Sequence, residues 1–203
     1  MFLYFRSFSY IMKSLEEIIH EQIIRSSDVI NNCGKNISDI IKSINAIISC
    51  IETGNKIVIF GNGGSAADSQ HMAAEFIGRY RLERKSLPAI ALTTDSSILT
   101  SIGNDYSFSE VFSRQCESMV NAKDVVIGIS TSGKSENVRK GLLVAKNRQA
   151  ITIGILGKDG GNIKDICDIS IIVKEEDTPK IQEAHRVIIH IICEIVEEKL
   201  KMM

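Results

Sequence analysis

The chain contains no tryptophan, only two prolines, and few aromatic residues, which make up 5% of its 203 positions. It also lacks an excess of charge of either sign, because 24 Lys and Arg residues stand against 25 Asp and Glu residues. Nucleic-acid binding relies on a basic surface, so a net charge of −1 gives no support for a nucleic-acid partner. No repeats, low-complexity tracts or linkers are present, and the length suits a single domain.

No cysteine pair has the C-x-x-C spacing, and the odd, scattered set of five indicates reduced thiols in a cytosolic protein. These are Cys33, Cys50, Cys116, Cys167 and Cys193. Long apolar runs are missing too: the longest, around 187–196, is interrupted by His190 and Glu194, so we expect no membrane span and a cytoplasmic location. The first ten residues, MFLYFRSFSY, lack a signal-peptide cleavage site. We interpret residues 1–12 as an N-terminal extension, with Met12 as an alternative start.

Five short, β-branched apolar runs alternate with helix-like segments. The runs are 56–60, 89–93, 125–130, 151–156 and 169–173, and the segments between and after them are 65–80, 95–102, 107–120, 135–148 and 178–200. Nearly continuous apolar runs are typical of strands buried on both faces. Alternating strands and helices predict an α/β fold with a parallel sheet covered on both sides. Two further helices, 13–32 and 36–53, precede the first strand.

Loops rich in Gly, Ser, Thr and Asp follow the first three predicted strands. They read GNGGSAADS at 61–69, TTDSS at 93–97 with GND at 103–105, and STSGKS at 130–135. Ligands of parallel sheets bind at the carboxyl ends of the strands. Glycine lets backbone N–H groups approach a ligand closely, and the N-terminus of the following helix favours an anion. The loops therefore predict a phosphorylated or polyhydroxylated ligand.

Residues 128–135, GISTSGKS, also fit the G-x-x-x-x-G-K-S phosphate loop of nucleotide hydrolases. Such an enzyme needs an acidic residue at another strand end to hold Mg²⁺, and Asp95 is the candidate, although it follows TT and does not close the apolar run. Gly61, Gly63 and Ala66 resemble a dinucleotide-binding loop without the acidic residue expected about 20 positions later. Both nucleotide interpretations are weaker than the sugar-phosphate one.

Two segments carry candidate reactive side chains. HMAAE places His71 and Glu75 on one helix face, which suits two metal ligands, a base beside an orienting imidazole, or merely a solvated pair. In the last helix, His190 lies within VIIHIIC, a context typical of a core histidine. Gln182 is eight residues earlier, about 12 Å along a straight helix. The two meet only if the helix begins near Gln182 with a bent first turn, or if two protomers contribute; His185 is the competing histidine.

Taken in order, the motifs closely resemble the phosphoheptose isomerases of the sugar isomerase (SIS) domain family. The matching blocks are GNGGSAADSQHMAAEFIGRY, GNDYSF, GISTSGKSENV, GKDGG and TPKIQEAHRVIIHIICEIVE. The resemblance implies one SIS domain at 13–203, a three-layer α/β/α fold with a five-stranded parallel sheet, assembled as a homotetramer with active sites between subunits. It also implies conversion of sedoheptulose 7-phosphate to D-glycero-D-manno-heptose 7-phosphate, the first step toward the heptose of lipopolysaccharide core or capsule.

The resemblance assigns roles to individual residues. It implies Glu75 as general base, His190 as general acid, and one zinc ion per subunit held by His71, Glu75, Gln182 and His190. The implied substrate contacts are Asn62, Gly63, Gly64, Glu75, Asn104, Asp105, Ser130, Thr131, Ser132, Ser135 and Gln182. Lys134 occupies a position that varies in the family. Whether the metal is catalytic or structural, and which subunit supplies each ligand, stay open.

A second class of function is a non-catalytic SIS module that binds a sugar phosphate or docks a partner. A related replication-initiator-associating protein of bacteria shares the fold but lacks the Glu of the His-x-x-x-Glu pair and the late His. The presence of both Glu75 and His190 favours the enzyme. Isomerisation through an enediol requires a carboxylate base and an acid beside it, which these two side chains supply.

Overall fold

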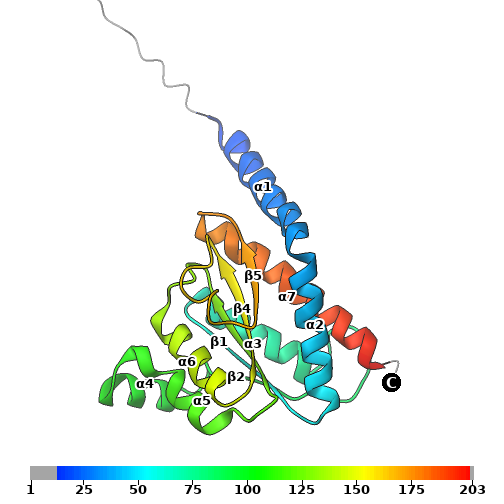
Figure 1. Cartoon of the computed structure of the whole chain (residues 1–203). Coiled ribbons are helices and arrows are strands. Elements are labelled where there is room, and N and C mark those ends of the chain that lie inside the picture. Colours follow the sequence, from blue (N-terminus) through cyan, green and yellow to red (C-terminus); the bar gives the residue numbers. More distant parts are fainter. Residues whose placement is uncertain (1–12, 202–203) are drawn as a thin grey trace, which may run out of the picture.

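The computed structural model describes residues 13–201, and the predicted N-terminal extension lies outside them. All five predicted strands form. They are β1 (Ile57–Gly61), β2 (Ala89–Ala91), β3 (Val125–Ser130), β4 (Ile151–Gly157) and β5 (Ile169–Val173). Every pairing is parallel, in the order β2-β1-β3-β4-β5 (Figure 1). The predicted five-stranded parallel sheet is confirmed.

The helices follow the predicted order, except that one predicted helix is divided into two elements. Their bounds are α1 (Leu15–Asn32), α2 (Ile37–Glu52), α3 (Gly64–Ile77), α4 (Ser96–Asp105), α5 (Ser113–Met119), α6 (Glu136–Asn147) and α7 (Thr178–Lys201). The single helix predicted over 107–120 is wrong, because a 3₁₀ turn, η2 (Phe108–Glu110), precedes α5. Another 3₁₀ turn, η1 (Cys33–Asn36), joins α1 to α2. Within residues 13–201, no helix combines the length and the apolar character needed to cross a membrane.

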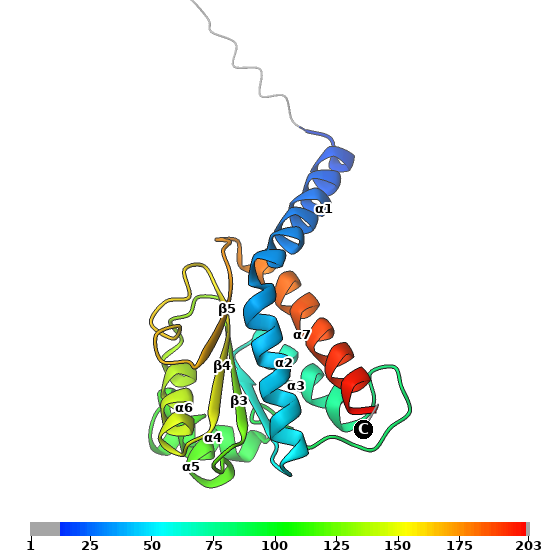
Figure 2. The same ribbon diagram turned by 45° about the vertical axis from the view of Figure 1, so that its right-hand side comes forward.

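The sheet separates two hydrophobic cores, because successive strand residues point to opposite faces. Ile57 and Ile59 of β1 pack into the core beneath α2, α3 and α7. Val58 and Phe60, the residues that alternate with them, pack into the core beneath α5 and α6, where the ring of Phe60 stacks on that of Phe112. Figure 2 shows α2, α3 and α7 on one side of the sheet and α4, α5 and α6 on the other. The three-layer α/β/α arrangement is therefore confirmed.

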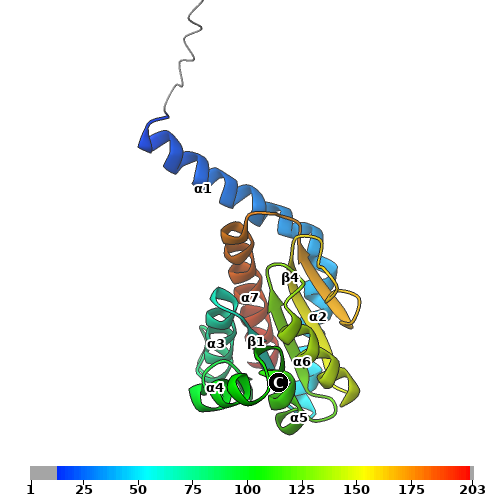
Figure 3. The same ribbon diagram turned by 90° about the vertical axis from the view of Figure 1, so that its left-hand side faces the viewer.

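Helix α1 projects away from these layers (Figure 3). None of its residues is buried, and its start is stabilised locally by a capping box between Ser14 and Glu17. The C-terminal half of α1 contacts the start of α7, because Lys180 Nζ donates a hydrogen bond to Ser26 Oγ at 2.7 Å. Large apolar side chains along α1 remain exposed: Leu15, Ile18, Ile19, Ile23 and Ile24. A single chain thus leaves one apolar face of α1 without cover.

Candidate active site

Two of the predicted ligand loops lie side by side because β1 and β3 are neighbours. Gly61, the last residue of β1, pairs in register with Ile129 near the end of β3. The loop after β1 leads into α3 and the loop after β3 leads into α6, so both helix N-termini face the same edge of the sheet. Asn62 and Asn137 join the two loops through a pair of reciprocal amide hydrogen bonds of 2.8 and 2.9 Å. Asn137 is buried and was not identified from the sequence, because its role depends on this long-range contact.

The loop after β3 gathers hydroxyl groups. Ser130 Oγ lies 3.0 Å from Ser135 Oγ and 3.5 Å from Ser132 Oγ, and Ser132 Oγ accepts a hydrogen bond from the backbone N–H of Lys134. Thr131 is half-buried beside them, whereas Lys134 is exposed. The hydroxyls stand immediately before α6, where unpaired backbone N–H groups and the helix dipole favour an anion. This is the geometry of a phosphate site that does not depend on the lysine.

The loop after β4 supports this phosphate loop from behind. Gly133 has a positive φ of 63°, a conformation that side chains rarely adopt. A Cβ atom there would overlap the backbone carbonyl of Gly160, and the Gly133 carbonyl accepts a hydrogen bond from the N–H of Ile163 at 3.1 Å. The GKDGG segment, 157–161, therefore fixes the path of the phosphate loop by close backbone packing.

A second cluster lies further along α3. His71 Nε2 is 2.9 Å from Nε2 of His190 on α7, and 3.4 Å from a carboxylate oxygen of Glu75 one turn later on α3. The two imidazole rings are inclined by 52°, with centroids 5.1 Å apart. The ring of Tyr80 lies 5.7 Å from that of His190. A carboxylate and two imidazoles in contact, all partly exposed, can bind and move protons.

The environment of His190 favours its neutral form. Burial lowers the pKa of His190, and the nearby His71 and Arg186 lower it further, while Glu75 acts in the opposite sense. A neutral imidazole has one N–H donor and one free nitrogen, which suits both the contact with His71 and metal binding. His185, the competing histidine, is fully buried, and within residues 13–201 its ring nitrogens make no well-formed hydrogen bond, although the backbone of Leu156 lies close enough to favour the charged form. His190 is the histidine of α7 that faces His71.

Gln182 lies in a different place from His190. Helix α7 begins at Thr178, about one turn before Gln182. The amide of Gln182 packs over Gly64 at the start of α3, where it would collide with any Cβ atom. In residues 13–201, no group of three or more His, Cys, Asp and Glu side chains is arranged as a metal site. Of the four predicted zinc ligands, His71 thus contacts Glu75 and His190 within one chain, whereas Gln182 packs over Gly64.

Several cavities of more than 300 Å³ open on residues 13–201, and one of them adjoins the predicted residues. A cavity of about 330 Å³ is lined by Gly64, Ala67, Asp68, Gln182, Glu183 and Arg186. Arg186 pairs with the buried carboxylate of Asp68 on its floor. Another cavity, about 340 Å³, lies between η1 and β5 and contains none of the predicted site residues. Size alone does not select the site, whereas the hydroxyl loop and the His71 cluster do.

Two other predicted elements have different surroundings. Asp95, the candidate magnesium ligand of the nucleotide interpretation, accepts a hydrogen bond from the N–H of Ile98 and so caps α4. Asn104 and Asp105 are exposed at the end of α4, where the amide of Asn104 donates to the Asp105 carboxylate at 2.8 Å. Among the described residues, neither forms a hydrogen bond or ion pair with the loops at 61–64 or 130–135.

The strand order, the hydroxyl loop before α6 and the polar start of α3 define a sugar-phosphate-binding α/β domain. The family model described as the SIS domain matches residues 28–157, more than half of the chain. A phosphoheptose isomerase of Pelobacter propionicus is 55% identical over 154 residues, covering 76% of this chain and 82% of that protein. The phosphoheptose isomerase of Clostridium acetobutylicum is 50% identical over 189 residues, covering 93% and 96%. The chain belongs to the SIS domain family and, within it, to the phosphoheptose isomerases.

Solved structures agree with this placement. The phosphoheptose isomerase of Neisseria gonorrhoeae superposes with a TM-score of 0.86 at 38% identity, covering 91% of this chain and all of that one. That of Francisella tularensis gives a TM-score of 0.87 at 32% identity, covering 92% of this chain and again all of the other. The likeness extends well beyond the residues matched by the family model, to α1 and α7.

Proposed function

We propose that the protein isomerises sedoheptulose 7-phosphate to D-glycero-D-manno-heptose 7-phosphate. The observation that carries this proposal is the contact of His71 with Glu75 on α3, the helix that begins at the sugar-phosphate edge of the sheet, and with His190 on α7. His71 lies seven residues after Gly64, about 10 Å along α3, a length comparable with an extended seven-carbon chain. The names of relatives at 50–58% identity support the same reaction.

The reaction moves one proton between two carbons and one between two oxygens. Glu75 takes the proton from C1 of the ketose while His190 supplies a proton to the oxygen on C2, which gives the enediol. The proton then returns from Glu75 to C2 as the oxygen on C1 gives its own proton to His190, which leaves the aldehyde and restores both side chains. A positioned acid–base pair of this kind accelerates such transfers by about 10²- to 10⁴-fold.

The proposal assigns substrate binding to the two loops that precede α3 and α6. Ser130, Thr131, Ser132 and Ser135 hold the phosphate with their hydroxyls and with the N-terminus of α6. Asn62, Gly63, Gly64 and Gln182 line the path from that phosphate toward Glu75. Asn104 and Asp105 belong to the predicted contacts, and their position at the exposed end of α4 fits a contribution to a neighbouring subunit's site.

Zinc is proposed as the metal, one ion per subunit. Two imidazoles and a carboxylate are donor types that zinc prefers, and His71, Glu75 and His190 already lie in contact. Gln182 of the same chain does not fit this set, because its amide packs over Gly64. A bound zinc ion would polarise the carbonyl that is being isomerised.

We further propose a homotetramer in the cytoplasm. The uncovered apolar face of α1 supports association, because exposed Leu and Ile side chains in a row are typical of interfaces. The five cysteines are unpaired, which supports a reducing compartment. The product would serve as a heptose precursor for lipopolysaccharide core or capsule.

The test is a coupled assay for heptose 7-phosphate formed from sedoheptulose 7-phosphate, run beside an assay of ATP hydrolysis. We expect isomerisation and no hydrolysis. Conversion of ATP without isomerisation would support the nucleotide interpretation of GISTSGKS. Binding of the sugar phosphate with no turnover, in protein loaded with zinc, would instead support a non-catalytic SIS module.

A further inference from the structure

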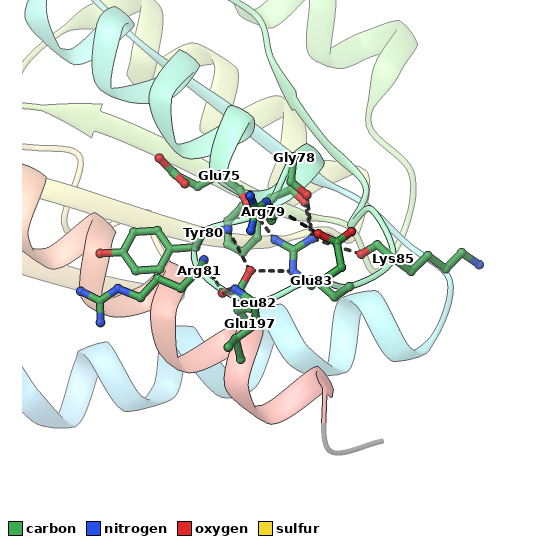
Figure 4. A network of polar contacts seen from close by, with 11 residues as sticks. Glu75, Gly78, Arg79, Tyr80, Arg81, Leu82, Glu83, Lys85 and Glu197 are labelled. Atoms are coloured by element: carbon green, nitrogen blue, oxygen red, sulfur yellow. Dashed lines mark hydrogen bonds and ion pairs between the residues drawn. The ribbon is translucent and has the colours of Figure 1, made fainter.

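The segment between α3 and β2, residues 78–88, is held by one buried carboxylate. Glu197, near the end of α7, is 1% exposed and accepts hydrogen bonds from the backbone N–H groups of Tyr80, Arg81 and Leu82 at 2.7–2.8 Å. It also accepts from Arg84 Nε at 3.0 Å. Burial opposes its ionisation, but the three N–H groups and Arg84 outweigh burial and hold the pKa of Glu197 below its ordinary value. Figure 4 shows this network.

Arg84 extends the same network to the end of α3. Its side chain is 6% exposed, and Nη2 donates to the backbone carbonyl of Glu75 at 2.8 Å. Nη1 donates to the carbonyls of Phe76 at 2.9 Å and of Lys85 at 3.1 Å. The last carbonyls of a helix lack partners within it, and a cation placed there satisfies them. The guanidinium therefore fixes the turn of α3 that carries Glu75.

Two residues whose backbone belongs to this network, Glu75 and Tyr80, carry side chains of the candidate active site. Glu75 and Tyr80 both extend toward the same side in Figure 4. The Tyr80 ring lies against His190, with centroids 5.7 Å apart and an inclination of 49°. His190 and Glu197 are two turns apart on α7. The buried ion pair of Arg84 and Glu197 thus connects α3, the 78–88 segment and α7, close to the residues that carry the Glu75 and Tyr80 side chains.

We propose that Arg84 and Glu197 are positioning residues for the isomerisation, which set Glu75 and Tyr80 against His190. The inference rests on the proposed function. A buried ion pair contributes little stability over an apolar pair of similar size, because both charges lose their hydration. Here hydrogen bonds of the pair reach the backbone of Glu75 and of Tyr80, the two residues of this region whose side chains belong to the candidate active site. Its contribution is the geometry of the site.

Glu197→Gln is the direct test, because it changes no volume. In the wild type, both carboxylate oxygens of Glu197 accept hydrogen bonds from N–H groups. In the variant, one of these oxygens is replaced by an NH₂ group, which cannot accept, so some of the N–H donors lose their acceptor in either orientation of the amide. We expect the amides of residues 80–82 to exchange faster with deuterium than in the wild type. At a temperature where circular dichroism shows full folding, kcat should fall roughly 10- to 100-fold, as a misplacement of about 1 Å produces. KM should change less, because the phosphate loop lies outside the network.

Glu194→Gln is the matched control. Glu194 lies on the same helix and pairs with the exposed side chain of Arg81 in the same segment, so its loss should leave kcat and the exchange of residues 80–82 unchanged. A double-mutant cycle distinguishes a specific effect of Glu197 on the position of Tyr80 from a general loss of rigidity in the protein. If Glu197 acts through Tyr80, the effects of Glu197→Gln and Tyr80→Ala on kcat should be strongly non-additive.

The outcomes distinguish this inference from the proposed function. A folded Glu197→Gln protein with wild-type kcat, or additive effects in the cycle, would overturn the positioning role while the wild type still isomerises. A wild type that does not isomerise would overturn the proposed function and the positioning role with it. If Glu197→Gln does not fold, Arg84→Lys replaces it, since lysine keeps the charge but not the fork that reaches both Glu75 and Phe76. Wild-type kcat in Arg84→Lys would likewise contradict the inference.

Discussion

His71 on α3 and His190 on α7 face each other with Nε2 atoms 2.9 Å apart, although 119 positions separate them in the chain. Only one of the two nitrogens can carry the proton of such a contact, so the pair holds a single shared hydrogen bond. Glu75, 3.4 Å from His71, completes a cluster of two imidazoles and a carboxylate, groups that can donate and accept protons.

Glu75→Gln should lower kcat by about 10²-fold or more, because the amide cannot accept the C1 proton. The chain fold and the oligomer should persist, since the Glu75 side chain is partly exposed and the substitution keeps its volume. Turnover is measured with sedoheptulose 7-phosphate, and assembly by light scattering on a sizing column. Turnover equal to that of the wild type would remove Glu75 as the base.

Protein purified without added metal should contain about one zinc ion per chain by elemental analysis, as a site of two histidines and a carboxylate predicts. His71→Ala should lose the metal and show a lower melting temperature, because a ligand that binds only the folded state stabilises it. His20→Ala on α1 is a control that should keep the metal. Full activity in the presence of a chelator, with negligible zinc, would contradict the assignment.

Ser132→Ala should raise KM roughly 10- to 100-fold, since a hydrogen bond to a charged group contributes about 1.5–3 kcal/mol. Lys134→Ala should change KM little, because Lys134 is exposed and its side chain does not enter the hydroxyl cluster. Steady-state kinetics on the two variants decide between a hydroxyl site and a nucleotide loop. Loss of activity in the lysine variant alone would show that the phosphate is held by Lys134.

Gly133→Ala should destabilise the protein by about 1–3 kcal/mol and weaken phosphate binding, because it forces a side chain into a left-handed conformation. The new methyl group would also meet the carbonyl of Gly160. Gly34→Ala is a suitable control, since nothing lies within 4 Å of the added carbon. Chemical denaturation measures the difference, and equal stability of the two variants would contradict the role given to the GKDGG segment.

His185 should make the protein less stable in acid. Burial lowers the pKa of His185 below the ordinary value of 6.5, so as pH falls through that value the unfolded chain takes up a proton that the native state refuses. This contribution is fully present above pH 6.5 and is lost below it by up to about 1.4 kcal/mol per pH unit. His185→Leu also removes two buried nitrogens that make no well-formed hydrogen bond within residues 13–201, so it should raise stability by about 1 kcal/mol near neutrality and flatten the acid slope. Parallel slopes for variant and wild type would show that His185 does not titrate in this way.

The fold was predictable because its signals are local. Runs such as Val125–Ser130 are apolar on both faces, and the Gly- and Ser-rich loops after them mark the carboxyl edge of the sheet. The split between η2 and α5 was missed, since Val111 and Phe112 continue the apolar spacing of a helix while being buried by tertiary packing. Fold-level reasoning likewise located the hydroxyl loop and the His71–Glu75 face.

Residues whose roles arise from distant contacts could not be found in this way. Glu197 follows an apolar helix face and reads as one more solvated carboxylate, yet it is buried by backbone N–H groups more than 100 positions away. Asn137 is a similar case, because its partner Asn62 is brought near by the pairing of β1 with β3. Arg84 is another, because its acceptor Glu197 lies on α7, the last helix of the chain. For Gln182, helix geometry predicts a separation of about 12 Å from His190 on a straight helix, and the two contact different turns of α3, at Gly64 and at His71.

The exposed apolar face of α1 affects the stability of that helix. An isolated helix of 18 residues is marginal in water, and α1 buries no side chain of its own in this chain. Its order therefore depends on whatever covers Leu15, Ile19 and Ile23, and so on protein concentration. Dilution, before heat or denaturant, should be the condition that first loosens this end of the molecule.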